Sequence, residues 1–357
     1  MNKRPLLALV VAALVVAAGA IWVSIASRPE RPAQADQRVL PALADSLDSV
    51  SEVRLSRGDG VATTLQRRDG GWFVAQRNYP ADPAKLRTLL IGLAGLRVIE
   101  QKTSDPARYA TLGVEDASGA QSHSVRVDVV AGTHTWSLLL GKVAQPDGNY
   151  VRVAGSADAL WARPHVEADP QPARWIHARV IDIPADQVQH VAIHPRSGAS
   201  YWLERAVRGA PDFTLHGVPA GRKAGSNSAI DALGGVLARL NVEDVKERAS
   251  NALEKASQAT FRTFDGLQID VDGTRDQESA WILVHAGVDA GTAKRFASKD
   301  KHDPAADAVA INARTQAYEF QIPVYQYDQI FRPLNDLLAP VTQKTAAPTA
   351  LKAGARP

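Results

Sequence analysis

The strongest constraint on this chain is a run of 21 residues without a charged side chain, from Leu6 to Ala26. At 1.5 Å per residue such a run forms a helix of about 30 Å, the thickness of a bilayer's hydrocarbon core. Lys3 and Arg4 precede it, and basic residues favour the cytoplasmic side of a membrane. The sequence therefore predicts a single transmembrane anchor over residues 1–27, with a cytoplasmic N-terminus. In a bacterial inner membrane, the body of the protein would then be periplasmic.

The residues that represent the predicted anchor are Leu6, Val10, Leu14, Gly19 and Trp22. Trp22 lies near the outer end, where an indole suits the membrane interface. The segment also holds small residues, which either allow close approach of a partner helix or are merely tolerated in lipid. The alternative is a cleaved signal peptide, because Ala33-Gln34-Ala35 has the small-x-small form of a cleavage site. The length of the apolar run favours the anchor, which would contact inner-membrane lipid.

The charge of the chain argues against nucleic acid as a partner. The formal net charge is +3, and Lys3, Arg4 and Arg28 account for all of it, since 38 basic residues balance 38 acidic residues from position 29 onward. Binding of nucleic acid requires a clustered basic face. The chain contains no cysteine, which excludes disulfides, thiolate metal sites and a cysteine nucleophile.

The rest of the chain contains a degenerate internal repeat. An alternating segment at 48–55 has a counterpart at 187–193, and the aligned Val50 and Val188 are 138 positions apart. Turns, further strands and a leucine-rich helix follow each segment in the same order. We expect an α+β fold of two β-β-β-α-α-β-β-β units with antiparallel sheets. The predicted parts are the anchor at 1–27, a tether at 28–45, repeats at 46–183 and 184–339, and a disordered tail at 340–357.

Several local patterns make more specific predictions. In the first unit Asp82 and Pro83 predict the start of the leucine-rich helix. In the second, Ser228 is predicted to cap the corresponding helix, with Asp231 three residues on as in a capping box. Both helices contain glycines, Gly92 and Gly95 in the first and Gly234 and Gly235 in the second, which predict close approach of each helix to a sheet. The second unit is also expected to hold a short helix at 249–259 and a strand at 308–312.

Three patterns suggest chemistry but have simpler interpretations. His190 and His194 lie in a strand pattern, where we expect histidines that face solvent rather than a zinc site. The segment 270–276 begins Asp-Val-Asp-Gly, but Asp272-Gly273 indicates a hairpin turn rather than a calcium loop. Ser298-Lys299-Asp300-Lys301 matches Ser-x-x-Lys without the companion motifs of penicillin-binding enzymes. We therefore expect no catalytic, cofactor-binding or metal-binding residues.

The tryptophans leave two interpretations open. Most lie in strand patterns, where they can belong to the core or line a sugar or peptide groove. They are Trp72, Trp136, Trp161, Trp175, Trp202 and Trp281.

Several motifs together resemble a bacterial family known as domain of unknown function 4340. These motifs are Asp69-Gly70-Gly71-Trp72, Tyr79-Pro80-Ala81-Asp82, Leu93-Ala94-Gly95-Leu96, Lys102 to Tyr109, Leu112-Gly113-Val114 and Tyr150-Val151-Arg152. The resemblance implies a membrane-anchored envelope protein associated with ABC transporter subunits of the gliding-motility type. It implies no catalytic residues.

These observations lead to one expected function and one alternative. We expect a non-enzymatic, membrane-anchored periplasmic accessory protein that binds the membrane subunits of an ABC transporter. The alternative is a periplasmic module that binds a glycan or peptide in a cleft between its two lobes.

Overall fold

The computed structural model describes residues 36–250, 253, 256–295 and 303–340. The predicted anchor, with Leu6, Val10, Leu14, Gly19 and Trp22, lies outside these ranges, as does the predicted tail beyond Pro340. In the ranges that are described, no helix has both the length and the apolar character needed to cross a membrane.

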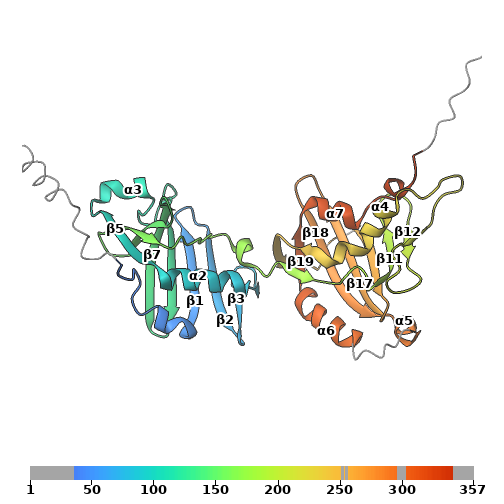
Figure 1. Cartoon of the computed structure of the whole chain (residues 1–357), viewed down its shortest axis with the longest axis horizontal. Coiled ribbons are helices and arrows are strands. Elements are labelled where there is room, and N and C mark those ends of the chain that lie inside the picture. Colours follow the sequence, from blue (N-terminus) through green and yellow to red (C-terminus); the bar gives the residue numbers. More distant parts are fainter. Residues whose placement is uncertain (1–35, 251–252, 254–255, 296–302, 341–357) are drawn as a thin grey trace, which may run out of the picture. The chain divides into compact units, whose positions relative to one another are not determined.

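Contacts within the chain divide it into two compact units. The first is Met1–Trp72 with Pro83–Gln171, and the second is Phe73–Asp82 with Pro172–Pro357. Strands pair antiparallel in both units, and helices accompany the sheets (Figure 1). The predicted combination of helices with antiparallel sheets is therefore confirmed.

The first sheet has nine strands in the order β4-β3-β2-β1-β6-β7-β8-β9-β5. Alternation builds its core, because Val53 and Leu55 of β1 pair with Val127 and Val129 of β6 and all four are buried. The strands are β1 (Val50–Arg57), β2 (Ala62–Arg68), β3 (Gly71–Val74), β4 (Tyr79–Pro80), β5 (Arg97–Thr103), β6 (Val125–Ala131), β7 (His134–Val143), β8 (Asn149–Val153) and β9 (Ala159–Arg163).

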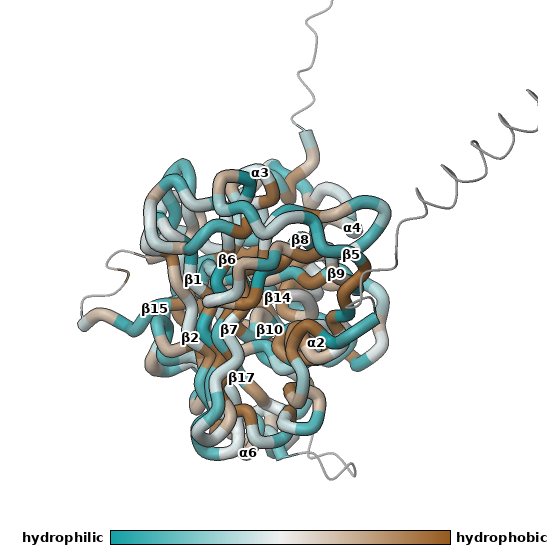
Figure 2. The backbone as a smooth tube through the Cα atoms, turned by 90° about the vertical axis from the view of Figure 1, so that its left-hand side faces the viewer, coloured by the Kyte–Doolittle hydropathy of each residue, from teal (hydrophilic) through white to brown (hydrophobic). Residues whose placement is uncertain are grey.

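The helix α2 (Pro83–Gly95) begins at the predicted residue and buries the predicted leucines Leu86, Leu89 and Leu93. It lies across the strands in Figure 1, and hydrophobic stretches follow both it and the strands in Figure 2. A Cβ on Gly92 would lie 3.1 Å from Val166. A loop after β9, rather than a strand, therefore makes this close approach. The other helical segments of the first unit are η1 (Ala44–Ser49), η2 (Pro106–Arg108) and α3 (Tyr109–Leu112), and the next one along the chain, η3 (Pro172–Trp175), already belongs to the second unit.

The second sheet has eight strands in the order β13-β12-β11-β16-β17-β18-β19-β15, and β10 pairs with β14 beside it. The strands are β10 (Arg179–Ile181), β11 (Val188–His194), β12 (Tyr201–Glu204), β13 (Thr214–His216), β14 (Leu240–Asn241), β15 (Asp244–Glu247), β16 (Ser257–Thr263), β17 (Leu267–Arg275), β18 (Ala280–Val288) and β19 (Tyr318–Ile322).

The two sheets share an order of connections. Apart from β4, each strand of the first sheet has a counterpart in the second at the same place in the order. The first strand of each sheet also bulges at one place, between Val50 and Glu52 in β1 and between Val188 and His190 in β11.

The predicted unit has six strands, two fewer than the eight that the sheets have in common, and one of the missing strands lies at the edge of both sheets. In each, a strand follows the helix and pairs with the last strand at the sheet edge, β5 with β9 and β15 with β19. Only Val98 of β5 and Val245 of β15 are buried. An exposed edge strand has no alternating apolar pattern, so periodicity did not reveal it.

The helices of the second unit are α4 (Asn227–Asp231), η4 (Ala232–Arg239), α5 (Ala290–Arg295), α6 (Pro304–Thr315), α7 (Val324–Ile330) and η5 (Leu334–Leu337). The strand predicted at 308–312 is wrong, because α6 occupies these residues. Asp303 caps α6 by accepting from the Ala305 amide, and Ala308, Ile311 and Thr315 form its buried face. The short apolar run is ambiguous between helix and strand by periodicity alone.

The helix predicted at 249–259 is also wrong for those of its residues that the structure describes. Strand β16 begins at Ser257, and residues 249, 250, 253 and 256 are not helical.

The hairpin turn predicted at Asp272-Gly273 is wrong as well. Strand β17 continues through both residues, and the turn lies at Asp276, whose carboxylate accepts from the Glu278 and Ser279 amides. Gly273 has a packing role, because a Cβ there would overlap the ring of Phe331 and lie 3.0 Å from Tyr327.

We expect Gly273→Ala to destabilise the second unit by about 1–3 kcal/mol, because forcing extra volume into a packed core displaces its side chains. Gly287→Ala in the neighbouring strand is the control, since a Cβ there meets nothing within 4 Å. Calorimetric melting of the two variants and the wild type measures the difference. Equal melting temperatures for both variants would contradict the packing role.

A paired side-chain contact holds the turn of Phe73–Asp82 in the second unit. Arg77 donates from Nε and Nη2 to the two carboxylate oxygens of Asp244, at 2.7 and 2.8 Å. Asp244 raises the pKa of the Arg77 guanidinium. The ring of Tyr79 meets the ring of Tyr318 edge-on at 5.0 Å, and the Tyr318 hydroxyl donates to the Asn78 carbonyl.

We expect Asp244→Asn to speed hydrogen exchange of the amides in 73–82 roughly tenfold to a hundredfold, since a two-pronged charged hydrogen bond contributes about 1.5–3 kcal/mol. Asp182→Asn is the control, because its partner Arg179 is 64% exposed and such surface pairs contribute little. Exchange mass spectrometry of the full chain resolves the segment. Unchanged exchange at 73–82 in Asp244→Asn would show that this pair does not hold the turn.

Candidate functional site

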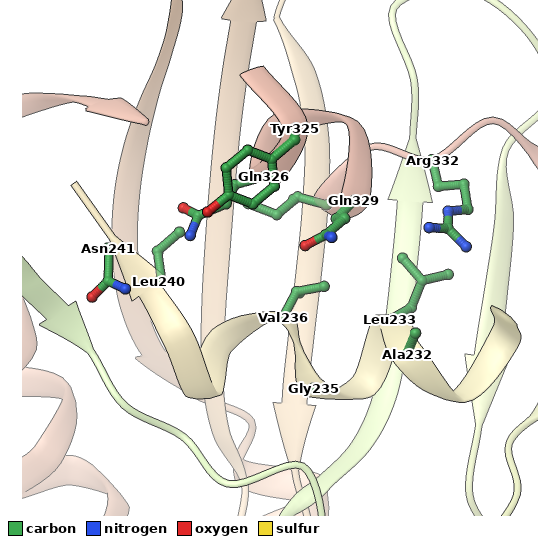
Figure 3. A pocket seen from close by; sticks show the side chains of 11 residues that line it. Ala232, Leu233, Gly235, Val236, Leu240, Asn241, Tyr325, Gln326, Gln329 and Arg332 are labelled. Carbon is green, nitrogen blue, oxygen red and sulfur yellow. The ribbon is translucent and has the colours of Figure 1, made fainter. Parts of the chain in front are cut away.

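A groove of about 470 Å³ lies between η4 and α7 in the second unit. Figure 3 shows side chains of α7 on one side of it and side chains of η4 on the other. The lining residues are Ala232, Leu233, Gly235, Val236, Leu240, Asn241, Tyr325, Gln326, Gln329, Ile330 and Arg332. The groove combines an apolar floor with a rim of amide groups, one phenol and one guanidinium.

The floor depends on how η4 packs. Leu233, Leu237 and Leu240 are buried, and a Cβ on Gly234 would overlap the ring of Phe213. The predicted close approach therefore involves Phe213, which lies just before β13. The predicted cap at Ser228 is wrong: α4 begins at Asn227, and the Asp231 carboxylate accepts from the Phe213 amide instead. Both contacts fix the helical segment that carries the floor.

The other side of the groove depends on α7. Tyr325 is 62% exposed, whereas Ile330 is buried. The hydroxyl of Tyr201 donates to the Arg332 carbonyl at 2.6 Å and so fixes the chain just after the helix. Burial raises the pKa of that tyrosine, so it remains a neutral donor. The Arg332 side chain reaches back to the Ala229 carbonyl at 3.4 Å.

This arrangement suits binding more than bond-breaking. Amides such as Asn241 and Gln329 both donate and accept hydrogen bonds, as a polypeptide backbone requires. The described residues that line the groove include no carboxylate, imidazole or lysine.

The histidines singled out from the sequence lie on β11, as predicted. His194 is exposed, and its Nδ1 lies 3.0 Å from the Ser200 hydroxyl. His190 is half-buried, and burial together with the charge of Arg262 lowers its pKa. No group of three or more metal-binding side chains occurs within the described ranges. Ser298, Lys299, Asp300 and Lys301 lie outside those ranges.

The tryptophans divide between the two interpretations. Trp136 and Trp175 are buried, at 8% and 5% exposure, whereas Trp202 is 43% exposed. The sequence alone did not separate these cases, because alternation does not show which face of a strand is covered.

The groove residues on α7 were not identified from the sequence. The sequence pattern predicts a final helical turn around 327–338, whereas the helix begins at Val324. Pro323, which precedes the helix, was the available signal, since proline is common at helix starts. An earlier start would have placed Tyr325 and Gln329 four residues apart on one face.

Comparison with known families gives one match. The model of the family described as Domain of unknown function (DUF4340) matches residues 72–261, more than half of the chain's 357 residues. No curated protein and no solved structure matches the chain. The matched range begins at Trp72, the last residue of the Asp-Gly-Gly-Trp motif, and includes the Tyr-Pro-Ala-Asp motif and α2. The chain is a member of the DUF4340 family.

Proposed function

We propose that this protein is a non-enzymatic, membrane-anchored accessory protein on the periplasmic side of a bacterial inner membrane. Its partners are the membrane subunits of an ABC transporter of the gliding-motility type. The observation that carries the proposal is the uncharged segment from Leu6 to Ala26, which is long enough to span a bilayer. The tether predicted at 28–45, 18 residues long, would keep the body close to the membrane surface.

The groove between η4 and α7 supports a role in binding a polypeptide. A buried apolar floor with an exposed aromatic residue at the rim is typical of sites that anchor protein partners. Tyr325 supplies that aromatic residue, and Gln329 and Arg332 supply hydrogen-bond donors beside it. A periplasmic segment of a transporter subunit is the proposed occupant.

We also propose that the two units are copies of one ancestral unit. The shared strand order and the shared bulge in the first strand support this proposal. Duplication would give one chain two related surfaces, of which the groove in the second unit is the candidate for the transporter.

The first experiment is affinity purification of the full-length protein from native membranes in mild detergent, followed by mass spectrometry. We expect an ATPase and its permease in stable proportion. Replacing residues 6–26 with an unrelated anchor then tests the helix: loss of the permease supports helix docking, and full retention excludes it. Recovery of the protein alone would contradict the transporter proposal.

The groove itself can be tested by site-specific crosslinking. A photoreactive residue at Tyr325 is expected to crosslink a transporter subunit in native membranes. The same residue at Val309, which lies on α6 and is 70% exposed, is the control and is expected to give at least tenfold less product. Equal yields at the two positions would exclude the groove as the docking site.

A further inference from the structure

One face of the second sheet carries side chains that are mostly polar and exposed or half-buried, among the residues that the structure describes. Phe331, just after α7, packs against Gly273 of β17, which defines the inner face. Side chains alternate along a strand, so Asp270 and Asp272 of β17 point to the opposite side. We call that side the outer face.

Six residues form a single row across the outer face. They are directly paired from strand to strand, and directly paired residues share a face. From β13 to β18 the row is His216, Trp202, Ala192, Thr260, Asp270 and His285.

One end of the row holds two stacked aromatic rings. The rings of Trp202 and His216 stack with centroids 5.1 Å apart and an interplanar angle of 5°. Trp202 is 43% exposed, so much of its ring is open to solvent. The next residue, Ala192, has the smallest side chain of the row. Its short side chain does not fill the space above the sheet between Trp202 and Thr260.

The other end of the row is a polar hollow of about 520 Å³. Asp270 accepts from Thr260 at 2.7 Å, and Asp272 accepts from the Gln258 amide at 3.0 Å. Asp270 also accepts from the Gln268 amide on both of its oxygens, at 3.1 and 3.0 Å. These contacts hold the two carboxylates in fixed positions, and the lone pairs that they leave over, chiefly on Asp272, can accept further bonds. The other side chains of the hollow include His194, Arg248, Leu283 and His285.

The corresponding face of the first sheet is covered by its own chain around β8. Arg152 of β8 is buried there, with its guanidinium 4.5 Å from the Tyr109 ring and bonded to the Val114 carbonyl and Asp116. By strand order and register, Leu283 holds the place of Arg152. Ala192 likewise holds the place of Arg54, which pairs with Glu52.

We propose that the outer face of the second unit binds a linear, uncharged oligosaccharide. A sugar ring has an apolar C–H face, which packs on an exposed aromatic ring, and a rim of hydroxyls, which need planar donors and acceptors. Trp202 supplies the aromatic ring. Asp270, Asp272 and Gln258 supply the planar acceptors and donors. Three strand spacings, about 14 Å, separate Trp202 from Asp270, so the ligand lies across the strands over Ala192.

The two carboxylates also define the class of glycan. An acidic sugar would place its own charge against two carboxylates, Asp270 and Asp272, with the guanidinium of Arg248 as the one opposing full charge among the described lining residues, and like charges repel at short range. The proposal goes beyond the transporter role and does not depend on it, because the groove at Tyr325 and the outer face share no residue.

The test is calorimetric titration of the full-length protein with soluble tetramers of glucose and of N-acetylglucosamine. The micelles must be of a detergent without a sugar headgroup. We expect binding of at least one tetramer, and about tenfold weaker binding by Trp202→Ala, because an aromatic contact is worth about a factor of ten. Trp202→Phe retains a ring and should restore most of the affinity. Val207→Ala, at a nearby residue that is 64% exposed, is the control and should bind as the wild type does.

Three results would overturn the proposal. The first is no heat of binding with either tetramer at millimolar concentration. The second is equal affinity of Trp202→Ala and the wild type, which would place the sugar elsewhere. The third is tighter binding of an acidic tetramer of galacturonate than of the neutral ones, which would contradict the role of the two aspartates. Crosslinking of a photoreactive residue at position 202 to a protein, without competition from either sugar, would identify a polypeptide ligand instead.

Discussion

Each unit depends on the same constraint: a wide antiparallel sheet has two faces, and the chain between its strands must cover at least one of them with apolar side chains. Burial of apolar area is the main stabilising term in folding. In the second unit η4 and α7 cover the inner face, where Ile282 and Phe320 are fully buried. This single requirement fixes which residue of every strand points inward. It therefore also determines which side chains remain available on the outer face.

Alternating strands and the leucine-rich helix were predictable from the sequence, because their patterns follow directly from burial on one side. The edge strands β5 and β15 were not, since each buries a single residue and therefore has no alternating apolar pattern. Pairing with one strand holds each of them, and Val98 of β5 also bonds to the backbone of Asp36 and Gln37. Helix α6 was misread for another reason. Its Ala-Val-Ala-Ile run suits a strand as well as a helix, and only the cap at Asp303 separates the two.

The candidate sites were harder to foresee than the fold. The groove combines residues about 90 positions apart, from Leu233 to Tyr325, and no local pattern relates them. The exposure of Trp202 depends on which strand lies beside it and on which face the helices cover. The sequence placed it in a strand correctly but could not show that it faces away from α7.

The segment Phe73–Asp82 has a consequence for how the protein is made. Arg77 bonds to Asp244, which follows it by 167 residues. At a synthesis rate of about 5–20 residues per second, the turn emerges roughly 8–33 s before its partner exists. During that interval the aromatic surface of Tyr79 lacks the ring of Tyr318. The second unit is therefore encoded by two separate segments of the sequence. A truncated protein that begins at Pro172 would lack Phe73–Asp82, which belongs to this unit.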